Sequence, residues 1–199
     1  RPGGTRMSDL LLIGHGSRDG AAATEFAALR DLVAARLPGR RVGGGFLELA
    51  DPPIDEAVDD LVAAGARDVV AVPYVLFGAG HLKDDGPAVL GRARRRHPGV
   101  RFRLARDLGI HPAVLDVAED RARAALAGLG DGARVVLVGR GSTDPDACAE
   151  FVKLARLLGD GRGLGTVEPA FVAMTTPSVE DALERAHRLG AERLAVIPA

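Results

Sequence analysis

The chain has 199 residues, of which 47% are hydrophobic, and it carries 26 Lys and Arg residues against 27 Asp and Glu residues. This length suits one large domain or two modest ones, and the nearly balanced charge gives no global electrostatic reason to expect nucleic acid or an anionic membrane as a partner. The longest apolar run, 69–77, is too short to span a bilayer, and the single cysteine can form no internal disulfide, which favours a reducing cytoplasm.

Short apolar runs alternate with longer amphipathic segments along the chain, a pattern typical of the βα units that build a parallel sheet. Residues 1–7 contain no apolar segment of a signal peptide and are set aside as an extension or an artificial remnant. Beyond them, the pattern predicts strands over 10–14, 42–47, 68–75 and 102–105, and helices over 21–37, 54–64, 85–97 and 112–127. A glycine-rich linker is predicted over 128–132.

After this linker the pattern starts again, with strands over 134–139, 167–173 and 193–198 and helices over 146–158 and 178–189. The two parts align without a gap: the segment GHGSRD at 14–19 matches GRGSTD at 139–144, and Pro73 matches Pro198. We therefore expect two tandem flavodoxin-like domains, 8–128 and 133–199, each a doubly wound parallel α/β sheet. The second copy lacks a fourth strand and two helices, so we expect the sequence to be part of a longer chain.

Two histidines of the first copy follow strands that should be neighbours. His15 comes directly after the first predicted strand, and His81 a few residues after the third. With the strand order 2-1-3-4 these strands are adjacent, about 4.8 Å apart, and open parallel sheets bind ligands beyond the carboxyl ends of their strands. We therefore expect both imidazoles in one crevice. The second copy has Arg140 in place of His15, so the first copy is the better candidate for catalysis.

This pair of histidines suits an open metal site. Imidazole is a common neutral metal ligand, and with an unperturbed pKa of about 6.5 it also takes up a proton at cellular pH. A closed structural site normally has four ligands, whereas two histidines can hold a divalent metal loosely and pass it on. Glu48, at the end of the second strand, can add a carboxylate at the rim. Glycines permit close approach of a flat ligand beside an apolar wall formed by Val75, Leu76, Phe77 and Ala79.

Simpler interpretations stay open for the histidines. A histidine at a strand end is more often a hydrogen-bonded structural residue than a ligand, and His97, at a helix end, suits the helix dipole. His111 can rim the crevice, although a structural role fits it better, and His187 is expected to be solvated. The GHGS segment could also cradle a phosphate. No Gly-rich Lys-Ser/Thr loop and no G-x-G-x-x-G pattern follows the first strand, however, so nucleotide binding is not favoured.

Taken together, these motifs resemble the CbiX-type sirohydrochlorin chelatases, which are class II tetrapyrrole chelatases. The resemblance is carried by LIGHGSR at 12–18, FLELADP at 46–52 and VPYVLFGAGH at 72–81, and LGIHPAVL at 108–115 continues it. The tandem arrangement is similar to the long bacterial form of the family. The resemblance implies insertion of Co²⁺ or Fe²⁺, with Ni²⁺ as a further candidate, into sirohydrochlorin on the way to cobalamin or sirohaem, without a nucleotide.

The resemblance also implies roles for individual residues. His15 and His81 fall on the metal-binding histidines of the family, and His15 on its proposed proton acceptor. Leu49 and the segment 75–80 match the substrate-contacting positions of the family. The predicted substrate-binding set adds four residues from their place at the crevice and their chemistry, Ser17, Arg18, Glu48 and Arg140, to Leu49, Val75, Leu76, Phe77, Gly78, Ala79 and Gly80. Because the substrate carries many carboxylates, Arg18, Lys83 and Arg140 are candidates to pair with them, Arg140 if the two domains face each other. The residues after His81, Leu82 to Asp84 and Gly86, depart from the usual pattern.

Three other functions are alternatives to the chelatase. A non-catalytic carrier of metal or tetrapyrrole would use the same cleft, and repeated turnover would distinguish the enzyme from it. A histidine phosphatase needs an arginine where Gly14 stands, and a serine hydrolase lacks its nucleophile elbow. The duplication allows either a monomer with pseudo-dimeric halves or a homodimer, since the shortened second sheet leaves an exposed edge.

Overall fold

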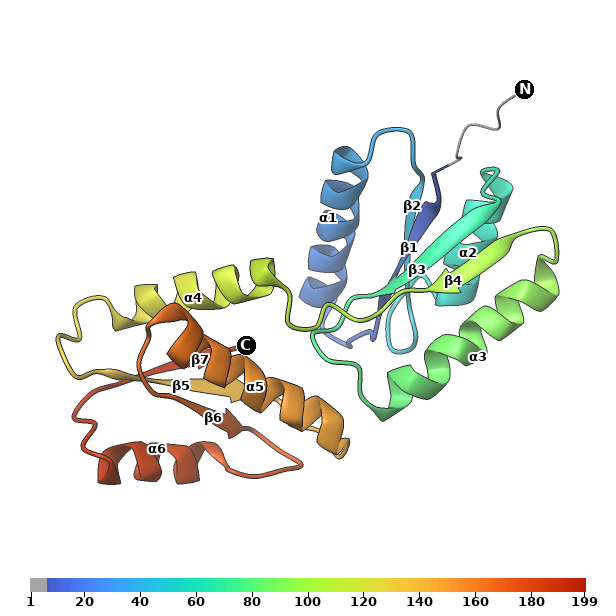
Figure 1. Ribbon diagram of the computed structural model, residues 1–199. Coiled ribbons are helices and arrows are strands. Elements are labelled where there is room, and N and C mark those ends of the chain that lie inside the picture. Colours follow the sequence, from blue (N-terminus) through green and yellow to red (C-terminus); the bar gives the residue numbers. More distant parts are fainter. Residues whose placement is uncertain (1–6) are drawn as a thin grey trace. The chain divides into compact units, whose positions relative to one another are not determined.

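Parallel strands joined by helices form one sheet in each half of the chain, as the computed structural model shows (Figure 1). The structure describes residues 7–199, except for the side chains of residues 80–84. The chain divides into two compact units between Leu108 and Gly109. No helix in the described part is long and apolar enough to cross a membrane.

The first unit holds a four-stranded parallel sheet with the order β2-β1-β3-β4, which confirms the predicted order. Winding reverses between β1 and β3, so the carboxyl ends of these two strands and of β2 lie at one edge of the sheet. The strands are β1 (Asp9–Gly14), β2 (Val42–Phe46), β3 (Asp68–Pro73) and β4 (Arg101–Leu104), and the helices are α1 (Gly20–Arg36), α2 (Ile54–Ala63) and α3 (Gly80–Arg96).

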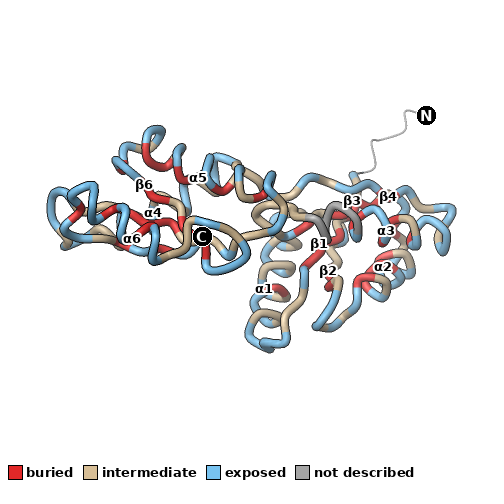
Figure 2. The backbone as a smooth tube through the Cα atoms, turned by 90° about the horizontal axis from the view of Figure 1, so that it is seen from below, coloured by how far each residue is buried: buried red, intermediate tan, exposed pale blue. Residues whose placement is uncertain are grey.

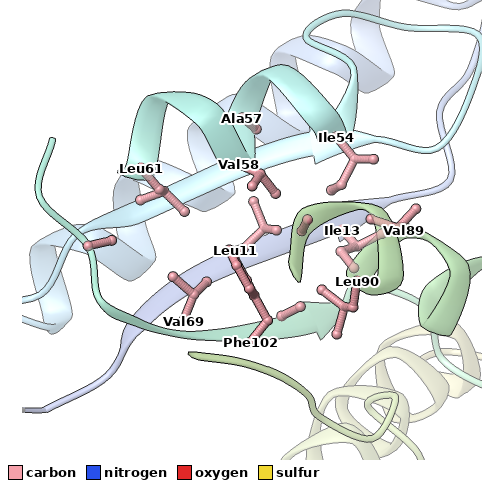
Figure 3. Packing of buried hydrophobic residues seen from close by; sticks show 13 residues of the cluster. Leu11, Ile13, Ile54, Ala57, Val58, Leu61, Val69, Val89, Leu90 and Phe102 are labelled. Carbon is pink, nitrogen blue, oxygen red and sulfur yellow. The ribbon is translucent and has the colours of Figure 1, made fainter. Parts of the chain in front are cut away.

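The core of the first unit follows the alternation of side chains along β1. Leu11 and Ile13 point to one face, where they pack with Val58 of α2 and Leu90 of α3 (Figure 3). Leu12 points to the other face and packs with the aromatic rings beneath α1. Helices thus cover both faces, which explains why the strands read as continuous apolar runs rather than alternating ones. In each unit most of the buried residues lie on the strands and helices (Figure 2).

The second unit holds a three-stranded parallel sheet with the order β6-β5-β7. Its strands are β5 (Arg134–Gly139), β6 (Val167–Phe171) and β7 (Leu194–Pro198), and its helices are α4 (Pro112–Leu126), α5 (Pro145–Arg162) and α6 (Val179–Arg188). The sequence pattern groups helix 112–127 with the first copy, over 8–128. In the structure α4 packs on β7 and α5 instead, so the compact units divide before this helix and not at the glycine-rich segment 128–132.

Two helices differ from their predicted bounds by more than one residue. Helix α3 begins at Gly80 rather than at residue 85, and Pro87, which lies inside the predicted helix too, stands in its interior. His81 therefore stands in its first turn and not in the preceding loop. Helix α5 continues past residue 158 to Arg162 and ends at Gly163, whose φ of 69° is left-handed. Gly159 lies inside the helix, and a Cβ there would lie 2.5 Å from the carbonyl oxygen of Gly165, so the close approach of the following loop requires glycine at this position.

Candidate metal centre

Backbone hydrogen bonds between the loops after β1 and β2 hold His15 at the carboxyl edge of the first sheet. The amides of Leu47 and Glu48 donate to the carbonyl oxygens of Gly14 and His15, at 3.0 and 3.1 Å, so the loops after β1 and β2 run together. Gly16 has a φ of 103°, and a Cβ on it would lie 1.6 Å from the Glu48 carbonyl oxygen. Only glycine fits there, which fixes the position from which the His15 side chain starts.

The imidazole of His15 lies beside the carboxylate of Glu48. Nδ1 of His15 and Oε1 of Glu48 are 3.3 Å apart, and the two side chains are 45% and 57% exposed. A carboxylate at Nδ1 favours the tautomer that carries its hydrogen there, which leaves Nε2 as the free lone pair for a metal or a proton. The sequence placed Glu48 at the rim as a substrate contact, and the structure adds that it pairs with His15.

Aromatic rings form the floor under this loop. The ring centroids of Phe26 and Phe46 are 4.6 Å apart, and Tyr74, directly after β3, lies 6.2 Å from Phe26. A Cβ on Gly14 would lie 2.8 Å from the Phe46 ring, so this second glycine lets the rings pack directly under the strand end. Tyr74 is 46% exposed. It is the only tyrosine of the chain and stands at the predicted edge, a signal that could have identified it from the sequence.

The loop after β3 carries the predicted apolar wall and is tied to the end of β4. Val75, Leu76, Phe77, Gly78 and Ala79 are each half-buried, as a ligand-contacting wall requires. The Gly78 amide donates to Oδ2 of Asp107 at 2.5 Å, and the Leu108 amide donates to the Val75 carbonyl oxygen at 3.1 Å. Sequence reasoning missed Asp107, although it follows a predicted strand at the same edge.

The second predicted ligand, His81, falls among residues 80–84, whose side chains lie outside the described part of the structure. The same holds for Gly80 as a contact and for Lys83 as a cation. Their backbone is the first turn of α3, which directly follows the wall at 75–79. The approach of His81 to His15 therefore stays a prediction. Among the described residues, no group of three His, Cys, Asp or Glu side chains gathers as a set of metal ligands.

The remaining predicted contacts of the first unit lie on the same loops. Ser17 accepts a hydrogen bond from the Asp19 amide at 3.0 Å, and Asp19 in turn caps α1, so the Ser17 hydroxyl first of all closes the turn. Arg18 is exposed. Leu49 is 51% exposed and has a φ of 62°, which is rare for a non-glycine residue. Its apolar side chain is thus held out at the edge by the backbone and not by packing.

The other histidines have structural surroundings. His97 ends α3, and its Nε2 lies 2.6 Å from Oδ1 of Asp59, a hydrogen bond that holds the pKa of the Asp59 carboxyl below its usual value. His111 belongs to the second unit and caps α4, accepting from the Ala113 amide at 3.2 Å. His187 is exposed on α6. These positions agree with the structural and solvated roles predicted for the three residues.

Arg140, the counterpart of His15, follows β5 in the second unit and is exposed. The Ala173 amide donates to its carbonyl oxygen at 3.0 Å, the same bond that Glu48 makes to His15. Gly141 repeats the left-handed φ, at 89°, and a Cβ on it would lie 1.9 Å from the Ala173 carbonyl oxygen. The second copy thus repeats the backbone of the site without its histidine and its carboxylate.

Comparison with known proteins agrees with the resemblance seen in the motifs. A family model described as CbiX matches residues 9–125 and 134–199. A sirohydrochlorin cobaltochelatase from Priestia megaterium is 34% identical over 98% of this chain and 65% of its own length. A sirohydrochlorin ferrochelatase from Bacillus subtilis is 33% identical over 86% of this chain and 66% of its own length. The chain therefore spans about two thirds of the length of these curated relatives.

Solved structures share the fold over almost the whole chain. The structure of SirB from Bacillus subtilis with Fe³⁺ matches 97% of this chain and 88% of its own, with a TM-score of 0.82 and 27% sequence identity. The tandem parallel sheets found here are thus a known architecture.

Proposed function

Because the chain belongs to the CbiX family, we propose that it inserts a divalent metal ion, Co²⁺ or Fe²⁺, into sirohydrochlorin. The observation that carries the proposal is the pair of His15 and Glu48 at the carboxyl edge of the first sheet, 3.3 Å apart and open to solvent. Relatives named as cobaltochelatase and as ferrochelatase support the reaction class equally, so both metals stay candidates, with Ni²⁺ behind them.

Metal insertion requires a group that holds the cation and a group that accepts protons. As the ion enters the macrocycle, two pyrrole N–H protons leave, and the ring becomes the ligand of the metal. His15 can serve both needs in turn, because its Nε2 lone pair would bind the incoming ion and, once the ion has moved on, accept one of the two protons, while the other passes to solvent water. Glu48 keeps the ring of His15 oriented and stabilises the imidazolium that then forms.

The rest of the edge suits a flat substrate with carboxylates on its rim. The half-buried wall at 75–79 and the exposed side chain of Leu49 offer apolar contact to the macrocycle, while Arg18 offers a cation to a carboxylate. His81 in the first turn of α3 is proposed as the second metal ligand. Two histidine ligands leave coordination positions open, which a site that must release its metal needs.

Several finer points stay predictions from the sequence. We expect the reaction to need no nucleotide, since no phosphate-binding glycine pattern follows β1. The lone Cys148 favours a cytoplasmic location, and the duplication favours a monomer with pseudo-dimeric halves or a homodimer. Whether the product serves cobalamin or sirohaem depends on the metal.

A spectral assay tests the proposal, because metal entry changes the absorption of sirohydrochlorin. The unaltered chain should metallate many equivalents of sirohydrochlorin with Co²⁺ or Fe²⁺ above the spontaneous rate. His15→Ala and His81→Ala should each lose about a hundredfold or more of that rate, as expected for removal of a proton acceptor or ligand. Glu48→Gln should weaken metal binding about tenfold, the usual effect of a lost partner of a ligating histidine.

The matched control is His187→Ala, since His187 is exposed on α6 in the other unit. Its rate should equal that of the unaltered chain. Absence of insertion with either metal overturns the proposal. A burst of one equivalent without further turnover would instead identify a carrier of the metal or the tetrapyrrole.

A further inference from the structure

We propose that the carboxyl edge of the second sheet is a second substrate-binding surface, in which Arg140 pairs with a carboxylate of the tetrapyrrole and Met174 contacts the face of its ring. The inference rests on the proposed function, because it assigns the same polycarboxylate macrocycle to this edge. It gives the second copy a role of its own in recognising the substrate and not in handling the metal.

The first argument is that the backbone of this edge repeats that of the metal-binding edge bond for bond. Val172 donates to the Gly139 carbonyl oxygen at 2.9 Å, as Leu47 does to that of Gly14 at 3.0 Å. Ser142 closes its turn by accepting from the Asp144 amide at 3.0 Å, as Ser17 does in the first copy. The side chain at position 140 therefore leaves the backbone in the same local setting as His15.

The second argument concerns Met174, the counterpart of Leu49. Its φ is 66° against 62° for Leu49, and the two side chains are 52% and 51% exposed. A left-handed conformation is unfavourable for a large side chain and persists only where the surrounding structure imposes it, most often at functional sites. Both copies hold an unbranched or γ-branched apolar side chain out into solvent at the same point. An apolar side chain exposed at this point does not contribute to the packed core, but it can contact a flat apolar ligand.

The third argument is the reversal of charge between the edges. The first copy pairs a histidine with the carboxylate of Glu48, a combination that attracts a cation. In the second copy the same two positions hold Arg140 and Ala173. Arg140 is a permanent cation, and Ala173 on the neighbouring loop provides no carboxylate in the place of Glu48. The carboxylate of Asp144 on the same loop caps α5. Guanidinium binds carboxylates through paired hydrogen bonds and cannot ligate a metal ion, so this edge selects the acidic rim of the substrate.

Titration of the intact chain with metal-free sirohydrochlorin, followed by absorbance or fluorescence, tests the assignment. Arg140→Ala should raise the Kd about tenfold, and the Kd of this variant should depend less on salt than that of the unaltered chain. Met174→Asn should raise the Kd about fivefold, because asparagine tolerates the left-handed backbone while removing the apolar contact. Met174→Leu, which restores the residue of the first copy, should bind as the unaltered chain does.

Two control variants remove the same kinds of side chain elsewhere in the second unit. Arg156→Ala removes an exposed cation of α5, and Leu189→Ser removes an exposed apolar side chain after α6, at the opposite edge of the sheet. Both should leave the Kd within about twofold of the unaltered value. An unchanged Kd in Arg140→Ala and Met174→Asn overturns the proposal, as does an equal rise in the controls.

The same set of proteins separates this proposal from the function itself. His15→Ala should lose metal insertion while its Kd for metal-free sirohydrochlorin stays close to the unaltered value. Binding that responds to Arg140 and Met174 in a chain that inserts no metal would contradict the proposed function and support the second surface. Metal insertion with an unchanged KM in both Arg140→Ala and Met174→Asn would support the proposed function and contradict the second surface.

Discussion

The carboxyl edges of the two sheets have the same backbone and different chemistry. In each, a left-handed glycine lies against the next loop, a serine closes the turn before a helix, and a pair of phenylalanine rings packs beneath, with centroids 4.6 Å apart in the first unit and 5.1 Å in the second. Only the outward side chains differ, His15 and Glu48 against Arg140 and Ala173. Packing thus fixes where a side chain is presented, and the residue at that point decides what it binds.

The largest effect should follow from disturbing the backbone that the two edges share. Gly16→Ala and Gly141→Ala would each place a Cβ within 2 Å of a carbonyl oxygen, at 1.6 and 1.9 Å, in a left-handed conformation. Neither loop can yield without breaking its bonds to the neighbouring loop. We expect each substitution to lower the free energy of unfolding by about 3 kcal/mol or more, measured by urea denaturation. The costs should be similar in both units, although only Gly16→Ala should also abolish metal binding.

A glycine in open space provides the control. Gly39 has a φ of 83°, but nothing lies within 4 Å of the position of its Cβ. Gly39→Ala should therefore show the cost of the left-handed conformation alone, about 1 kcal/mol. If Gly16→Ala cost no more than this, the tight approach of the loops at the first edge would be contradicted.

A smaller effect is expected at Asp107, which ties the loop after β3 to the loop after β4 at the first edge. Its carboxylate accepts from the Gly78 amide at 2.5 Å and so holds the loop that leads into α3. Asp107→Ala leaves this half-buried amide without its partner and should destabilise the loop by about 1 to 2 kcal/mol. Hydrogen exchange at Gly78 should become faster, and the rate of metal insertion should fall more than the affinity for sirohydrochlorin.

Asp107→Asn serves as the matched variant, because the amide oxygen can still accept the bond without its charge. It should recover most of the protection of Gly78. The Tyr74 amide, which donates to the Ile13 carbonyl oxygen within the sheet at 2.7 Å, should exchange at the unaltered rate in both variants. Loss of protection at Tyr74 would mean that Asp107 supports the whole sheet rather than the loop.

The comparison of the edges also shows what the sequence could foretell. Strand order, the duplication and the place of His15 follow from periodicity and topology, because side chains at strand ends can be located without knowing any contact. The bond between Asp107 and Gly78 could not be predicted, since it depends on how two irregular loops cross. Nor could the position of α4, because whether a helix between two sheets packs on one or the other depends on tertiary contacts and not on its own sequence. The predicted start of α3 at residue 85 was too late, because the glycines at 78 and 80 favoured a loop through His81.

The smallest effect should appear at the helices that follow β2 and β6, where the copies cap differently. Helix α6 begins with a capping box: the Asp181 amide donates to the Ser178 hydroxyl oxygen at 3.1 Å, and the Ser178 amide donates to the Asp181 carboxylate at 3.0 Å. Helix α2 begins at Ile54, and its N-cap residue, Pro53, provides no side-chain cap. Ser178→Ala should therefore lower the free energy of unfolding by about 1 kcal/mol at neutral pH, measured by urea denaturation. Glu56→Ala, at the position of α2 that matches Asp181, should have a smaller effect.

The pH dependence of this cap has a definite sign. The hydrogen bonds from Ser178 hold the pKa of the Asp181 carboxyl below its ordinary value of 3.8, so the ionised carboxylate favours the folded state. Its contribution is complete above pH 3.8 and is lost as the pH falls through the lower pKa of the folded protein. Asp181→Ala should therefore be less stable than the unaltered chain at pH 6, and the difference should shrink at pH values of about 3 and below. A difference that stayed constant down to acid pH would show that Asp181 acts through packing and not through its charge.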